Sequence, residues 1–473
     1  MHKRYLLLSL FPILVILLFA QNPSDQSSSD QSSNSSIFGS AEMNSGDMIK
    51  QGRQTFRFDT FGDEAFWGGQ LRLHETINHL TPSQALKLGL KVDSDALPSA
   101  VIHAIKTGKV NLNDPTVTLL LIKLNAVLGV KGFFNTNGTL KSVGLTCAVC
   151  HSTVDNSIAP SIGKRIDGLA NRDLNVGAIT ASAPNLQPVI NLLKIVHPGI
   201  TAGQVRAVLN SWGPGKFDAE IFLDGKAFNP QQVTNGMVTA MNVPGATLIP
   251  NARGLAGHNL HTWTGGWGSI PYWNAFVAVD EMHGKGTFFD ERFDNPAQFP
   301  IAAKAKLGHV SIPNPDDDRV TGKLAALQFY QLALPALKPR PGIDFDPDAA
   351  ARGDELFSGK AKCNSCHREP LWTEPGWNQH TPGEMKIDGF EANRAPASIN
   401  AAGKQVHGYR TMNLSGVFVR DRGLFMFPQN KGRFYHDGRF KSLFDVTNSY
   451  NERFNLGLTN EEKHDIDEYL KSL

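Results

Sequence analysis

The start of the chain separates into an apolar block and a polar block. Residues 5–19 are apolar with few exceptions and follow the basic residues Lys3 and Arg4. This arrangement is typical of a secretory signal peptide, because a membrane span needs about 20 apolar residues. We therefore predict a signal peptide over residues 1–20 and a periplasmic or extracellular protein. The alternative is an uncleaved signal that anchors the protein in a membrane.

A polar segment follows the apolar block. Residues 22–36 contain no large apolar side chain that could offset the entropy lost on ordering. We predict a flexible Ser-rich tether over residues 21–55.

The rest of the chain contains helical patterns with Gly-rich and Pro-rich interruptions. Three prolines lie between Leu334 and Gly342 and favour an extended, stiff connector. We predict an N-terminal domain over residues 56–334, a Pro-rich linker over 335–345 and a C-terminal domain over 346–473.

Helix signals are clearest in the C-terminal part. Asp346 and Pro347 have the residue types of a helix cap and a first helical position. Thr459 and Glu462 form a capping-box pattern. Apolar residues follow it at helical spacing: Ile466, Tyr469, Leu470 and Leu473. Since no alternating run is long enough for a large sheet, we predict a mainly α fold with long loops and few short strands.

Charge excludes one class of partner. The chain has 46 Lys and Arg residues against 44 Asp and Glu residues. This near balance implies no large basic face, so we expect no nucleic-acid partner.

All four cysteines belong to two copies of one pattern. Each copy has two cysteines three positions apart and a histidine directly after the second, namely Cys147, Cys150 and His151, then Cys363, Cys366 and His367. Two thiols at this spacing can bind the vinyl groups of one haem as thioethers, and the histidine can ligate its iron. The sequence therefore predicts two covalent haem c groups, with His151 and His367 as axial ligands.

Three other interpretations compete with haem attachment. One structural zinc shared by the two pairs is disfavoured because the pairs lie far apart in the sequence. A thioredoxin-type redox pair does not explain the histidines. A disulfide within each pair would be strained and leaves the histidines equally unexplained.

The C-terminal part resembles the bacterial diheme cytochrome c peroxidase superfamily, which includes the methylamine-utilisation diheme enzyme and the bacterial rubber oxygenases. The resemblance rests on four segments, namely residues 353–357, 409–411, 434–438 and 458–473. It thins over residues 56–334. It implies two cytochrome c-like haem domains, with Arg410 against a haem propionate and His436 at a haem edge.

The resemblance leaves the sixth ligand of the second haem open. Tyr450 occupies the position where peroxidases of the family have a methionine ligand. A tyrosine at this position resembles the methylamine-utilisation enzyme. Tyr450 is therefore the candidate distal ligand, and simple helix packing is the alternative. The other candidates are Met412, Met426, His380 and His407.

The first haem departs from the peroxidase pattern. Asp167 stands where the family has a distal histidine. The iron either keeps an open face for a small oxidant or is closed by a distant side chain. The candidates for closing it are His197, His258, His261 and His283.

Residues 258–283 are rich in aromatic side chains, and Trp263 is a candidate electron relay between the haems. Core packing is the alternative for this cluster.

The predicted function is electron transfer by an exported diheme c-type cytochrome, with peroxidase-like oxidoreductase activity at the N-terminal haem. We expect a redox protein as donor or acceptor and hydrogen peroxide or dioxygen as oxidant. The alternatives are an oxygenase-like or cofactor-maturing enzyme and a non-catalytic electron-transfer protein.

Overall fold

The computed structural model describes residues 40–473 except 235–236 and 400–401. The predicted signal peptide and residues 21–39 of the predicted tether lie outside the described residues. Contacts divide the chain into two compact units, residues 1–45 and 46–473. In the described residues we find no helix that combines the length and the hydropathy needed to cross a bilayer.

The first helix, α1 (Ala41–Phe58), occupies the last part of the predicted tether. The structure therefore has a helix, not an irregular segment, over residues 41–55. Its second half is ordered by packing, since Thr55 and Phe56 are buried and Gly52 lies directly against the Ala326 carbonyl. A Cβ at position 52 would be 1.9 Å from that oxygen, so this contact requires glycine.

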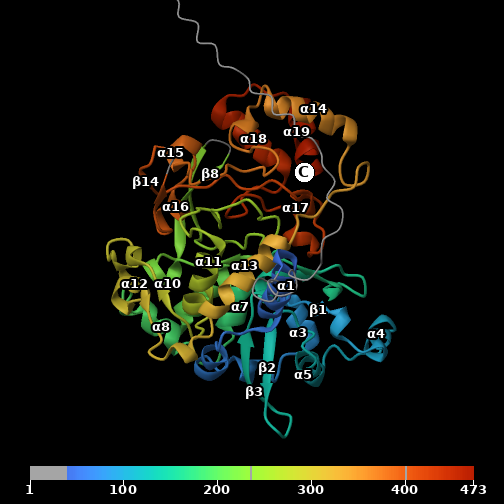
Figure 1. Ribbon diagram of the computed structural model, residues 1–473, viewed down its shortest axis with the longest axis vertical. Coiled ribbons are helices and arrows are strands. Elements are labelled where there is room, and N and C mark those ends of the chain that lie inside the picture. Colours follow the sequence, from blue (N-terminus) through green and yellow to red (C-terminus); the bar gives the residue numbers. More distant parts are fainter. Residues whose placement is uncertain (1–39, 235–236, 400–401) are drawn as a thin grey trace, which may run out of the picture. The chain divides into compact units, whose positions relative to one another are not determined.

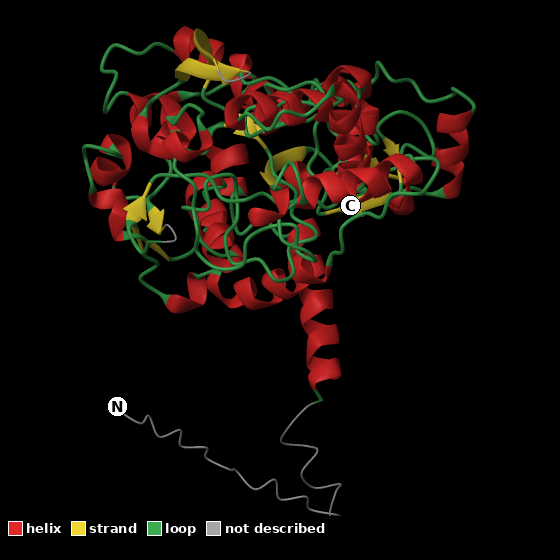
Figure 2. Cartoon of the chain, turned by 90° about the horizontal axis from the view of Figure 1, so that it is seen from above, coloured by secondary structure: helices red, strands yellow, loops and turns green. Residues whose placement is uncertain are grey.

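The fold is mainly helical, as the sequence predicts (Figure 2). The helices after α1 are α2 (Leu73–Ile77), α3 (Pro82–Lys87), α4 (Ser99–Lys106), α5 (Pro115–Lys123), α6 (Ala148–His151), α7 (Val176–Ala181), α8 (Gln187–Leu193), α9 (Ala202–Ser211), α10 (Ile221–Asp224), α11 (Ile270–Phe276), α12 (Pro300–Ala305), α13 (Leu324–Ala333), α14 (Pro347–Ser358), α15 (Pro382–Met385), α16 (Phe390–Arg394), α17 (Phe418–Arg422), α18 (Leu443–Phe454) and α19 (Asn460–Ser472).

The strands are short and pair only two at a time within the described residues. Antiparallel pairs are β2 (Val130–Phe134) with β3 (Leu140–Leu145), β4 (Ser152–Val154) with β6 (Arg165–Asp167), β7 (Lys216–Phe217) with β10 (Thr247–Leu248), β8 (Phe228–Thr234) with β9 (Met237–Pro244), β11 (Phe288–Phe289) with β12 (His309–Val310), and β13 (Ser398–Ile399) with β14 (Gln405–Val406). One pair is parallel, β1 (Val92–Asp93) with β5 (Ile162–Gly163).

The predicted helix caps in the C-terminal part are confirmed. Asp346 caps α14 and Pro347 is its first residue, while Thr459 and Glu462 form the capping box of α19. Helices α14 and α19 lie side by side (Figure 1). Gly353 permits this approach, because a Cβ there would be 2.0 Å from the Asp465 carbonyl oxygen.

Two short segments are π-helical, namely η1 (Ala65–Gln70) and η3 (Val277–Glu281). The first of them contacts the residues directly after the second, because the Trp67 indole donates a 3.2 Å hydrogen bond to the Met282 carbonyl and Phe66 stacks on His283. Isolated π-helical turns are rare and often lie at functional sites.

The C-terminal part of the chain contacts the N-terminal part closely. Arg394 of α16 forms buried ion pairs with Asp218 at 2.7 Å and Asp224 at 2.8 Å. Asp173 accepts hydrogen bonds from the Phe427 amide and the Asn430 side chain. The residues after 346 therefore help to build the surroundings of the N-terminal motif, and the division into two haem domains stays a prediction.

Candidate functional site

The first cysteine motif lies in a short turn of helix. Cys147 directly precedes α6, His151 ends it, and β4 begins at the next residue. The loop after β6 covers this turn, since the Gly168 amide donates to the His151 carbonyl at 2.7 Å and the Asn171 amide donates to the Cys150 carbonyl at 2.8 Å. Both thiols are free.

The side chains of this motif line a large cavity of about 260 Å³. Its walls are mainly apolar and include Leu73, Ile77, Val127, Leu174, Trp267 and Ile270. A cavity of roughly 150 Å³ accepts benzene, so this one has room for a larger planar ring system. The cavity brings Cys147, Cys150 and His151 together on one wall.

Burial sets the protonation of the motif. It raises the pKa of each thiol, Cys147 and Cys150, to about 12, so both sulfurs are protonated at neutral pH. Thiols in that state are poor redox nucleophiles, which weakens the thioredoxin-type interpretation.

Burial also lowers the pKa of His151 to about 4; the nearby Pro250 carbonyl opposes this shift and the charge of Arg172 adds to it. The ring is therefore neutral, the form that ligates a metal. Its Nδ1 atom is buried and makes no hydrogen bond of normal geometry.

Three carboxyl groups on the cavity wall were not identified from the sequence. They belong to Glu220 before α10, Glu281 in η3 and Glu391 in α16. Glu220 accepts a 3.1 Å hydrogen bond from the Trp267 indole, and burial raises its pKa to about 7.

Glu281 and Glu391 each have one buried oxygen without a hydrogen-bond partner among the described residues. Burial, reinforced by the charge of Glu220, raises the pKa of both carboxyls well above the ordinary value. Burial therefore favours the protonated form of both carboxyls, which lie on the cavity wall.

Arg410 also lines this cavity, although it belongs to the C-terminal part. Its guanidinium donates to the Thr262 carbonyl at 2.5 Å and to the Thr411 carbonyl at 3.4 Å, and it forms no ion pair among the described residues. Burial lowers the pKa of Arg410 to about 10. A buried cation held only by carbonyl dipoles retains the capacity to bind an anion.

Trp263 contacts Arg410, and His436 contacts its neighbour Tyr409. Trp263 lines the cavity, and its indole donates a 2.6 Å hydrogen bond to the Leu248 carbonyl. His436 is buried; its carbonyl accepts from the Leu248 amide at 2.7 Å, and its ring stacks on Tyr409.

The histidines that could bind the first haem iron as its sixth ligand occupy different places in the structure. His261 lines the cavity, and burial lowers its pKa to about 3. His283 lines a second cavity of about 70 Å³, whose wall also includes Trp67 and Glu281. His197 bonds the Gly225 carbonyl at 2.9 Å.

His258 lies outside the cavity lining, and its buried Nδ1 atom has no hydrogen-bond partner among the described residues. Asp167 is held by Arg57, Ser152 and Tyr330. Of the four histidines, the structure thus brings only His261 to this wall.

The second motif begins with the short 3-10 turn η7 (Cys363–Ser365). His367 Nδ1 lies 3.0 Å from the Trp372 carbonyl, an arrangement that orients the ring, and the Met412 carbonyl is a second neighbour of the ring. Tyr450 of α18 lies near this motif. Its pKa is raised above the usual range mainly by burial, with smaller contributions from Tyr435, Cys363 and Cys366.

The other candidate sixth ligands of the second haem iron do not lie together in the structure. The Met412 carbonyl lies close to His367, and Met426 precedes the Phe427 amide that contacts Asp173. His407 Nδ1 lies 3.2 Å from the Ala392 and Ala395 carbonyls.

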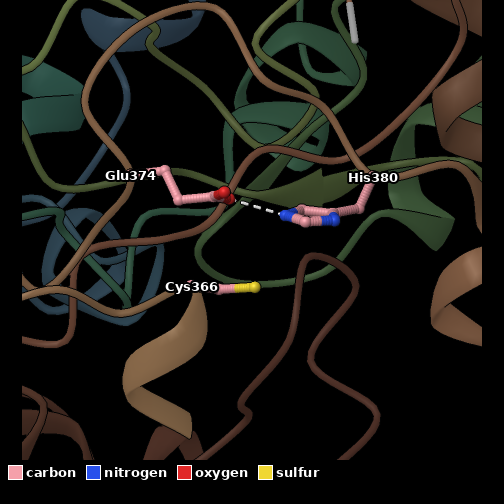
Figure 3. A group of neighbouring side chains, drawn as sticks. All are labelled: Cys366, Glu374 and His380. Atoms are coloured by element: carbon pink, nitrogen blue, oxygen red, sulfur yellow. Dashed lines mark hydrogen bonds and ion pairs between the residues drawn. The ribbon is translucent and has the colours of Figure 1, made fainter. Parts of the chain in front are cut away.

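Cys366 has a second possible use, because it lies beside Glu374 and His380 (Figure 3). The three potential ligand atoms lie within 4.8 Å of one another, and His380 Nε2 is 2.6 Å from a Glu374 oxygen. Hydrogen bonding to Cys366 and to Glu374 raises the pKa of His380 to about 10. Such a group could hold a divalent metal, and a thioether at Cys366 would compete with that use.

Comparisons with known proteins add little. Neither a family model nor a curated protein sequence matches the chain. Hydrazine synthase from Kuenenia stuttgartiensis matches over 48% of this chain and 72% of its own, with 17% identity and a TM-score of 0.26. A similarity this low carries no argument about fold or function.

Proposed function

We propose that the protein is an exported diheme c-type cytochrome that transfers electrons and reduces peroxide at the haem on Cys147 and Cys150. One observation carries the proposal: the two thiols and the His151 imidazole share one wall of a large, mainly apolar cavity. That combination is what a covalently attached haem requires.

The residues around the first motif fit such a group in four respects. Its thiols are free, its histidine is neutral, its walls are apolar, and Arg410 provides a buried cation without an anionic partner. When bound, the haem would supply a redox-active iron that can react with a small oxidant. His151 would hold it from one side.

The carboxyl groups would supply protons. Reduction of one hydrogen peroxide to two waters consumes two electrons and two protons. Glu281 would hold a proton at its buried carboxyl on the cavity wall, and Glu220 and Glu391 would hold further protons, because burial raises the pKa of all three. A carboxylic acid with a raised pKa is suited to donate a proton at neutral pH.

The second motif would receive electrons from a redox protein and pass them on. His367 and the candidate distal ligand Tyr450 would hold the second haem, with Trp263 as candidate relay. Export through the signal peptide over residues 1–20 is part of this proposal, because the predicted compartment is periplasmic or extracellular.

One observation favours a non-catalytic alternative. His261 lies on the cavity wall as a neutral imidazole and could bind the first iron as a sixth ligand. A six-coordinate first haem would transfer electrons without reacting with peroxide or dioxygen.

The test uses the full chain, purified after export. Mass spectrometry should show the mass of two covalent haems, and reduced-minus-oxidised spectra should show haem c at two per chain. Hydrogen peroxide added to the half-reduced protein should then be consumed. A colourless protein contradicts the haem proposal, while a first haem that stays six-coordinate and inert in every redox state contradicts only the peroxidase activity.

A further inference from the structure

Three arginines form a cluster near the first motif, and they outnumber the carboxylates around them. Arg172 lies in the loop after β6, Arg420 belongs to α17, and Arg433 lies in the segment after α17. Arg420 donates to the backbone carbonyl of Arg433. The charges of Arg420 and Arg433 are close enough to Arg172 to lower its pKa, which burial already lowers.

Arg172 is the least satisfied of the three. Its side chain is 6% exposed, and its Nη1 atom is buried without a hydrogen-bond partner among the described residues. The Nε atom of Arg420 is likewise buried and unpartnered. Buried donors without acceptors are rare in folded proteins and call for a partner such as a bound ion or ligand.

The neighbouring acid does not supply that partner. Asp173 forms a buried ion pair with Lys91 at 2.6 Å, and its oxygens also accept from the Phe427 amide and the Asn430 side chain. Its carboxylate is therefore already occupied. The cluster therefore keeps a buried positive charge at Arg172, with the half-buried Arg420 and Arg433 close by, and a buried charge is unfavourable unless an anion compensates it.

We propose that the buried Arg172 and the half-buried Arg420 and Arg433 form a site for a carboxylate. The site lies beside the first motif, because the Asn171 amide bonds the Cys150 carbonyl and the Arg172 charge reaches His151. A propionate of the haem on Cys147 and Cys150 is one source of the carboxylate, which rests on the proposed function. A free carboxylate such as formate is the other source.

The test uses the holoprotein and the variants Arg172→Gln and Arg420→Gln. Arg53→Gln is the matched control, because Arg53 is exposed on α1. Mass spectrometry first establishes that each variant carries its haems, which separates failure of the proposed function from failure of this site. Arg172→Lys keeps the charge but loses the planar fork that binds carboxylates.

The readouts are the propionate bending bands in the resonance Raman spectrum and the thermal shift produced by sodium formate against sodium chloride. A shifted band in both Gln variants and in Arg172→Lys, but not in the control, supports a propionate at the site. An unchanged band with a saturable formate stabilisation that Arg172→Gln abolishes supports a free carboxylate. An unchanged band without specific formate stabilisation overturns the proposal. If the chain lacks haem, the formate measurement alone decides whether the arginines bind a carboxylate.

Discussion

The backbone amide of Arg410 donates a 3.2 Å hydrogen bond to the carbonyl of Trp263. Arg410 belongs to the C-terminal part of the chain and Trp263 to the N-terminal part, yet both line the cavity of the first motif. This contact therefore fixes a cation and an indole from distant segments next to each other. It places the candidate relay at the boundary between the two motif-bearing parts.

Replacing Trp263 with phenylalanine tests whether the indole has more than a packing role. The variant loses the indole hydrogen bond and leaves the buried Leu248 carbonyl with one acceptor site unused. We expect a loss of about 1–3 kcal/mol in unfolding free energy, measured by denaturant titration.

If Trp263 is also a relay, reduction of the first haem through the second should slow in stopped-flow measurements. Trp377→Phe is the control, because this tryptophan is 53% exposed. Electron transfer at the normal rate in Trp263→Phe, with the stability loss present, would restrict Trp263 to packing.

Glu281→Gln should slow peroxide turnover without removing the haem. The change keeps the side-chain shape but removes the proton that the buried carboxyl carries into the cavity. We expect kcat to fall by roughly 10²-fold or more, the usual contribution of a positioned acid. The exposed Glu355→Gln on α14 is the control, and equal kcat values in the two variants would rule out proton donation by Glu281.

Asp280 should make the protein less stable as the pH rises. Burial raises the pKa of Asp280 to about 8, so the folded state keeps a proton that the unfolded state releases above its ordinary pKa of 3.8. Between these values the unfolded state binds fewer protons, and the free energy of unfolding decreases with pH by up to ~1.4 kcal/mol per unit.

The measurement is the free energy of unfolding at pH 6, 7 and 8. Asp280→Asn should raise the stability at pH 7 and make the slope shallower. A smaller slope of the same sign remains, because burial also raises the pKa values of Glu220, Glu281 and Glu391. The exposed Asp316→Asn should change neither the stability nor the slope. Histidines with lowered pKa values, such as His261 and His283, act only below about pH 6.5, where the unfolded state binds more protons. A slope in Asp280→Asn as steep as in the unchanged protein would contradict this assignment.

The sequence was sufficient for features that depend on neighbouring residues. The caps at Asp346 and Thr459 and the mainly α class follow from local spacing, and all are confirmed. The cavity carboxyls could not be predicted in this way. Glu220, Glu281 and Glu391 come from three separate elements that only tertiary packing brings together, so no spacing in the sequence connects them.

Helix α1 shows the same limit from the other side. The polar composition after the signal peptide predicts a tether that reaches residue 55, but Thr55 and Phe56 are buried and Gly52 packs against Ala326. Distant packing orders this segment, and composition near the tether contains no sign of that partner. Haem attachment and the distal ligands stay predictions.

Cys366 can serve either a haem thioether or a metal group with Glu374 and His380, and His380→Gln separates the two. We expect both the unchanged protein and His380→Gln to carry two covalent haems by mass. Neither protein should contain a stoichiometric divalent metal. The exposed His464→Gln is the control. A bound metal that disappears in His380→Gln, with only one haem in the unchanged protein, would assign Cys366 to the metal.

Tyr450→Phe tests the candidate sixth ligand of the second haem. The change removes only the phenolic oxygen, so packing of the ring against Phe454 and Arg453 should persist. If this oxygen ligates the oxidised iron, low-temperature electron paramagnetic resonance should show a changed ligand set for one haem and an unchanged signal for the other. Tyr435→Phe is the control, since Tyr435 also lies near Tyr450 and donates no proposed ligand. Identical spectra for the unchanged protein and Tyr450→Phe would assign Tyr450 to helix packing and leave Met412 and His380 as the next candidates.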